Sequence, residues 1–150
     1  VKPILEDQGM RLEVDSEGEI EILGNAQALT RVIVNLLDNA VKYGPKGQTV
    51  VLAIRQSSGS AHLSVTDEGP GVPPHDRQRI WQAYHRLESD VNSNVTGTGI
   101  GLSVVSDLAK LQGGRAWVES AQSGGARFVV QLPLSTTGQG HSREAEDEDY

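Results

Sequence analysis

Apolar residues recur at helical spacing early in the chain. A stripe of this kind is typical of an amphipathic helix that buries one face, and it comprises Leu29, Val32, Ile33, Leu36, Leu37 and Ala40. Asn25 can cap the first turn through its side-chain oxygen, and Gly44-Pro45 can stop the last one. We therefore predict a helix between Asn25 and Gly44.

A second helical pattern follows a cluster of glycines near residue 100. Its predicted buried positions are Val104, Val105, Leu108, Ala109 and Leu111. Its predicted water-facing positions are Ser103, Ser106, Asp107 and Lys110. Gly113-Gly114 is expected to end this helix.

The region between the two helices gives weaker signals. Pro73-Pro74 predicts a short helix that continues through Ile80, Trp81 and Tyr84, because proline is tolerated in a first helical turn. Residues 87–96 show no period, and a loop of this length between elements is often a lid. We therefore expect a mobile loop there.

Alternating patterns predict four strands in two consecutive pairs. Residues 49–55 and 61–67 are expected to pair across a turn at residues 57–60, and residues 115–120 and 126–132 across a turn at residues 123–125. In the last strand, one face is predicted to carry Ala126, Phe128, Val130 and Leu132. Strand pairs between helices favour an α+β fold, a two-layer α/β sandwich, over a doubly wound parallel sheet.

Composition bounds the class of protein. The chain has 150 residues, of which 37% are hydrophobic, enough for one domain with a sizeable core. Its formal net charge of −7 includes five acidic residues within positions 144–149, so residues 135–150 are expected to form a disordered tail behind a domain at residues 1–134. No basic cluster offers a path for nucleic acid. The absence of cysteine excludes disulfides and thiol nucleophiles.

The chain shows neither an apolar run of membrane-spanning length nor a signal-peptide pattern. We therefore expect a cytoplasmic fragment without direct membrane contact. Because the first residue is Val1, we expect a piece of a longer chain.

Polar residues accompany the first helix. Asn35, Asn39 and Lys42 are spaced so that they share one strip beside the apolar stripe. Amide oxygens suit a hard divalent cation, which Mg²⁺ sites complete with phosphate oxygens and water, and a lysine can meet a phosphate. The alternative is an ordinary solvated helix face.

Asp67 ends a strand on the apolar side, since parity places it with Leu63 and Val65. A buried carboxylate needs a designated partner, and an adenine amino group would serve. Gly69 and Gly71 would let a ring approach the backbone closely. The alternative is an aspartate that only forms a turn.

Gly97, Gly99 and Gly101 precede the second helix, so free N–H groups and the positive end of the helix dipole would face a polyphosphate. The cluster matches neither a dinucleotide fingerprint nor a P-loop. A flexible hinge is the alternative for this cluster alone. Taken together, the three segments indicate a site for Mg-ATP.

The same segments resemble the motifs of a known family. Residues 35–43 resemble the N box, and residues 67–71 and 97–102 the two glycine boxes, of the ATP-binding catalytic domain of bacterial sensor histidine kinases. Residues 80–84 resemble its F box, with Trp81 and Tyr84 where the family usually has phenylalanine. The resemblance covers residues 1–134. It implies the Bergerat fold, a mixed and mostly antiparallel sheet covered on one face by about three helices.

The resemblance also implies roles for individual residues. Asn39 would be the principal Mg²⁺ ligand with Asn35 nearby, and Lys42 and Arg86 would contact phosphates. Tyr43 would pack on the adenine, and Asp67 would accept its exocyclic amine. Gly69 and Gly71 would shape the base pocket. The implied phosphate-binding segment is Thr96, Gly97, Thr98, Gly99, Ile100, Gly101 and Leu102.

By resemblance, the domain donates the γ-phosphate of ATP to a histidine on a separate dimerisation domain, which passes it to a response regulator receiver domain. None of His62, His75, His85 and His141 has the sequence context of that acceptor. The acceptor domain is therefore expected elsewhere in a parent kinase anchored in the inner membrane. The isolated fragment is expected to be monomeric.

Other members of the superfamily, including gyrase, mismatch-repair ATPases and a heat-shock chaperone, hydrolyse ATP with a glutamate at the position of Asn35. An amide cannot take a proton from water, so slow ATPase activity is expected here. Two further alternatives stay open. They are a protein serine kinase of anti-sigma-factor type and a non-catalytic ATP-binding module.

Overall fold

The structure is a computed structural model that describes residues 9–16, 25–82, 101–122 and 124–134. Within these ranges the elements are, in chain order, β1 (Arg11–Ser16), α2 (Ala26–Tyr43), β2 (Thr49–Ser57), β3 (Ser60–Thr66), two 3₁₀ turns η1 (Pro74–Asp76) and η2 (Arg79–Trp81), α4 (Gly101–Leu111), β4 (Arg115–Ser120) and β5 (Ala126–Pro133). The predicted lid at residues 87–96 and the predicted tail at residues 135–150 lie outside the described residues.

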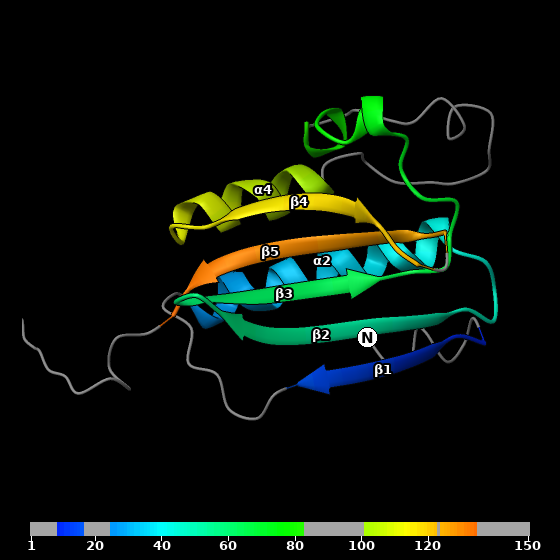
Figure 1. Ribbon diagram of the computed structural model, residues 1–150, viewed down its shortest axis with the longest axis horizontal. Coiled ribbons are helices and arrows are strands. Elements are labelled where there is room, and N and C mark those ends of the chain that lie inside the picture. The colour runs from blue at the N-terminus through cyan, green and yellow to red at the C-terminus, as the bar shows by residue number, and fades with distance from the viewer. Residues whose placement is uncertain (1–8, 17–24, 83–100, 123, 135–150) are drawn as a thin grey trace, which may run out of the picture.

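The strands form one five-stranded sheet in the order β1-β2-β3-β5-β4. β1 pairs with β2 in parallel, while the other three pairs are antiparallel. A parallel pair needs a crossover, and α2 lies in the connection from β1 to β2. Both α-helices lie on the same face of the sheet (Figure 1). The predicted α+β sandwich with a mixed sheet covered on one face is confirmed.

The core lies between the helices and the covered face of the sheet. The strands supply it by alternation, since every second residue of β3 and β5 is buried. The most deeply buried members of the core, on the sheet and on the helices, are Leu36, Leu37, Ala40, Val50, Leu63, Val65, Val105, Ala109 and Val130. Phe128, predicted to face inward, is also buried and packs edge-to-face against Trp81 with ring centroids 6.0 Å apart.

The first helix begins as predicted. The Asn25 side chain accepts hydrogen bonds from the N–H groups of Gln27 and Ala28 at 2.7 and 3.1 Å, so it caps two free donors of the first turn. The helix ends at Tyr43. Gly44 does not adopt the left-handed conformation that a glycine stop often uses, since its φ is −90°.

The second helix ends in a Schellman motif. The Gly114 N–H bonds to the Ala109 carbonyl, the Gly113 N–H bonds to the Lys110 carbonyl, and Gly113 has a φ of +86°. The expected burial of Leu111 is wrong, because this side chain is 77% exposed. At about 100° per residue, Leu111 lies roughly 120° around the helix from Val105.

The region after Pro73-Pro74 differs from the predicted short helix. It forms the two separate 3₁₀ turns η1 and η2, and Arg77 between them donates to the Val72 carbonyl at 3.1 Å and to the Ser120 hydroxyl at 2.6 Å. The second of these bonds fastens the segment to the end of β4. Ile80 is buried and Trp81 packs against the core as expected, and Tyr84 lies outside the described residues.

The first hairpin has a two-residue turn. Both Ser58 and Gly59 have positive φ, at 51° and 79°, which suits the right-handed twist of the flanking strands. The tighter turn lets β2 run to Ser57, two residues beyond the predicted end.

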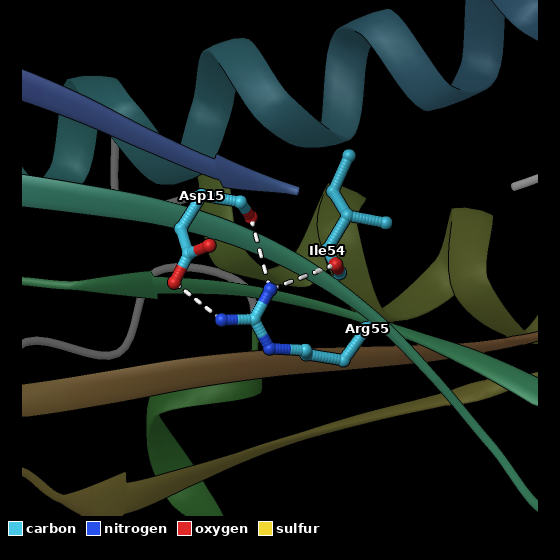
Figure 2. A network of polar contacts seen from close by, with 3 residues as sticks. All are labelled: Asp15, Ile54 and Arg55. Carbon is cyan, nitrogen blue, oxygen red and sulfur yellow. Dashed lines mark hydrogen bonds and ion pairs between the residues drawn. The ribbon is translucent and has the colours of Figure 1, made fainter. Parts of the chain in front are cut away.

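The edge strand β1 was missed by the sequence analysis. Leu12 and Val14 do alternate with polar residues, but five of the six positions of β1 are exposed and the pattern is short. The Arg55 guanidinium joins β1 to β2 by donating to the Asp15 carboxylate and to the main-chain oxygens of Asp15 and Ile54 (Figure 2).

None of the helices within the described ranges combines the length and the hydropathy that a bilayer crossing requires.

Candidate functional site

One end of the sheet gathers most of the predicted site. The C-terminal turn of α2, the end of β3 and the start of β5 lie at the same end of the sheet, and the first turn of α4 faces that end (Figure 1). A main-chain hydrogen bond joins the end of β3 to the start of β5, since the Asp67 N–H bonds to the Ala126 carbonyl at 3.0 Å. Segments far apart in the sequence therefore come together at one end of the sheet.

Asp67 is the buried carboxylate at this end of the sheet. Its side chain lies on the inward side with Leu63 and Val65, as predicted, and the residue is 4% exposed. One oxygen, Oδ1, accepts hydrogen bonds from the N–H groups of Gly69 at 2.9 Å and Ala126 at 3.1 Å. Among the described residues, none donates to the other oxygen, Oδ2. Asp67 therefore forms a turn and still has one carboxylate oxygen for a ligand.

The electrostatics of Asp67 follow from this position. Burial removes water from the carboxylate and raises its pKa above the ordinary value of 3.8. The hydrogen bonds from Ala126 and Gly69 stabilise the charged form and oppose that rise. A donor on a ligand would stabilise the charge further, as an amino group would.

Glycines line the backbone around Asp67. A Cβ atom at Gly125 would lie 2.1 Å from the Asp67 carbonyl oxygen, and one at Gly71 would lie 2.9 Å from the Gly124 carbonyl oxygen. Gly71 also has a φ of +78°. At Gly69, whose φ is not positive, a Cβ atom would lie 3.0 Å from the Tyr43 carbonyl oxygen. These three glycines thus let the end of α2, the β3 loop and the β5 turn touch through their backbones.

The polar strip of α2 is partly exposed. Asn35 and Asn39 are half-buried, and the side-chain amide of neither one bonds to another described residue. Lys42 pairs with Asp38 at 3.1 Å, an exposed pair of small energetic value. Within the described ranges, no group of three His, Cys, Asp or Glu residues could hold a metal ion. The two amide oxygens fit Mg²⁺ as minor ligands that phosphate oxygens and water would complete.

Gln48 is a polar residue at this end of the sheet that the sequence analysis overlooked. It is 1% exposed, and its Nε2 donates to the Ala40 carbonyl at 2.8 Å while its Oε1 accepts from the Glu68 N–H at 2.9 Å. Parity with the buried Val50 and Leu52 of β2 was the signal that could have found it.

The remaining predicted residues fall into two groups. Gly101 and Leu102 form the first turn of α4, where a Cβ atom at Gly101 would meet no other described residue within 4 Å and Leu102 packs against the core. Arg86, Thr96, Gly97, Thr98, Gly99 and Ile100 lie outside the described residues. Their predicted phosphate contacts stay predictions.

His62 and His75 are the histidines that lie within the described ranges. His62 packs edge-on against Trp117 on the sheet, with ring centroids 5.9 Å apart. His75 lies in η1 and pairs with Asp76 at 3.3 Å. Neither residue lies on a long helix.

Comparisons with known proteins agree with this geometry. Residues 24–136 match the family of histidine kinase-, DNA gyrase B-, and HSP90-like ATPases. The adaptive-response sensory kinase SasA of Trichormus variabilis is 34% identical over 129 residues, which cover 85% of this chain and 32% of that protein. The chain spans about a third of the length of this and similar curated relatives.

Solved structures show the same likeness. A mycobacterial sensor histidine kinase, MprB, superposes with a TM-score of 0.76 at 29% identity and covers 89% of this chain and 88% of that one. Full-length ShkA, solved in complex with AMPPNP, gives 0.75 at 30% identity and covers 89% of this chain and 27% of that one. The chain therefore belongs to the histidine kinase-, DNA gyrase B- and HSP90-like ATPase family, among the ATP-binding catalytic domains of sensor histidine kinases.

Proposed function

We propose that this domain binds Mg-ATP at the end of the sheet that carries Asp67 and donates the γ-phosphate to a histidine on a separate dimerisation domain of its parent chain. A response regulator receiver domain would then take the phosphate. The observation that carries the proposal is the buried Asp67 carboxylate, whose Oδ2 has no hydrogen-bond partner among the described residues.

The residues of α2 support the metal part of the proposal. Asn39, with Asn35, would hold Mg²⁺, which neutralises charge on the transferred phosphate. Lys42 would exchange its exposed pairing with Asp38 for a phosphate at little energetic cost. Because Asn35 cannot accept a proton, the position that carries a glutamate in the ATP-hydrolysing members has no base to activate water here, and we expect the phosphate to await a nucleophile from another domain.

ATP binding is tested by thermal unfolding of the domain with and without Mg-ATP. Ligand at about 100 times its dissociation constant adds about 2.7 kcal/mol, which raises the melting temperature by roughly 5–11 °C for a chain of this size. Asp67→Asn offers an amide donor where the adenine amine needs an acceptor, so its shift should be much smaller. No shift in the wild type, or an equal shift in the variant, contradicts binding at Asp67.

Phosphotransfer is tested by mixing the domain with the histidine-containing dimerisation domain of its own parent chain and labelled Mg-ATP. We expect acid-labile label on the dimerisation domain, because phosphohistidine is unstable to acid. The domain alone should release phosphate only slowly. Acid-stable label on a protein serine would select the serine kinase instead, and rapid release by the domain alone would contradict the missing-base argument.

A further inference from the structure

Gln48 joins two parts of the nucleotide site that lie on different elements. Its amide donates to the Ala40 carbonyl in the last turns of α2 and accepts from the Glu68 N–H, next to Asp67. The Glu68 side chain returns the contact by accepting from the Thr49 N–H at 3.1 Å. The resulting Gln48 bridge consists of Ala40, Gln48, Thr49 and Glu68.

The bridge is built into the local sequence. A Cβ atom at Gly44 would lie 2.0 Å from Gln48 Nε2, so the glycine after α2 leaves the space that the amide fills. Since the φ of Gly44 is negative, this space, and not backbone conformation, accounts for the glycine. Full burial and two hydrogen bonds at 2.8 and 2.9 Å fix the side chain in one place.

The two ends of the bridge depend on Gln48 to different degrees. The Ala40 carbonyl also accepts from the Gly44 N–H at 2.9 Å, so it keeps a partner if the amide is removed. For the Glu68 N–H, Gln48 is the partner that the described residues supply. Loss of the amide therefore loosens the β3 loop more than it loosens α2.

We propose that Gln48 is a positioning residue that holds the Asp67 loop against the end of α2 and so sets the preference of the site for adenine. The inference rests on the function proposed above. In this role Gln48 acts through the loop and not through a contact with the base. It fixes the segment that carries the Asp67 carboxylate relative to Asn39 and Tyr43 on α2, and so the base position relative to the phosphates.

The test compares dissociation constants for ATP and inosine triphosphate with Mg²⁺. Inosine carries an oxygen where adenine carries the amino group, so it offers Asp67 no donor there. The wild type should prefer ATP by at least roughly tenfold. In Gln48→Met, which keeps the size of the side chain but loses the amide, the preference should fall by roughly three- to tenfold.

Gln112→Met is the matched control. Gln112 also joins two elements, by accepting from the Asn25 N–H at 2.9 Å, but it lies at the far end of α2. Both variants should lower the melting temperature, whereas the ATP preference should fall only in Gln48→Met. A folded Gln48→Met with the wild-type preference overturns the inference. A wild type without ATP preference overturns the proposed function instead.

Gly44→Ala provides a second route if Gln48→Met does not fold. Alanine tolerates the backbone conformation of Gly44, and its methyl group displaces the flexible end of Gln48. The ATP preference should fall as in Gln48→Met. An unchanged preference in a folded Gly44→Ala overturns the inference.

Discussion

At the scale of single residues, Asp67 combines two interpretations that the sequence offers as alternatives. Its Oδ1 forms the turn, by bonding to the N–H of Gly69, and its Oδ2 is left for a ligand. Parity predicts the burial of this residue. No pattern predicts the bond to Ala126, because that contact depends on the pairing of β3 with β5.

Burial of Asp67 makes the stability of the unliganded domain depend on pH. Its folded pKa lies above the unfolded value of 3.8, so its contribution is fully present below 3.8 and is lost as pH rises through the folded pKa. Asp67→Asn removes this titration. We expect the unliganded variant to melt above the wild type at neutral pH, by a margin that narrows as pH falls towards 3.8.

Melting temperatures across that pH range, measured without nucleotide, check this expectation. The exposed Asp107→Asn is the control and should show no such trend. A variant that is less stable than the wild type at neutral pH would contradict the dominance of desolvation. Together with the binding test, the result would show that the site keeps Asp67 for its ligand at a cost to stability.

At the scale of elements, the sequence predicts some helix ends correctly and others not. The Asn25 cap and the Gly113-Gly114 stop are local motifs, and both form as predicted. Leu111 was misplaced because it lies in the last turn, away from the centre of the buried stripe. The role of Gly44 could not be read locally, since it depends on a side chain from the next strand.

Removal of the cap gives a test at this scale. Asn25→Ala leaves two N–H groups of the first turn of α2 without their side-chain acceptor. We expect a loss of about 1 kcal/mol, which corresponds to a melting temperature lower by about 2–4 °C. Thr30→Ala is the control, because the Thr30 hydroxyl bonds to a carbonyl within the same exposed turn and should matter less. Equal losses would contradict the capping role.

At the scale of the whole molecule, the layers were predictable and the sheet order was not. Alternation in β3 and β5 indicates which faces pack inward, so the two-layer arrangement follows from the sequence. The parallel neighbour of β2 is different. Arg11 pairs with Thr49, and the whole of α2 lies between them in the sequence, so no turn indicates the contact. Most residues of β1 are exposed, so its hydrophobic pattern is also too weak to indicate it.

The hydrogen bond from the Ala126 N–H to Asp67 also bears on how the domain forms. It joins residues 59 positions apart, and contacts of such long range form late because closing the chain costs entropy. A chain that ended before β5 would keep all three signature segments and still lack a finished pocket. We therefore expect nucleotide binding by this domain to require its last strand, β5.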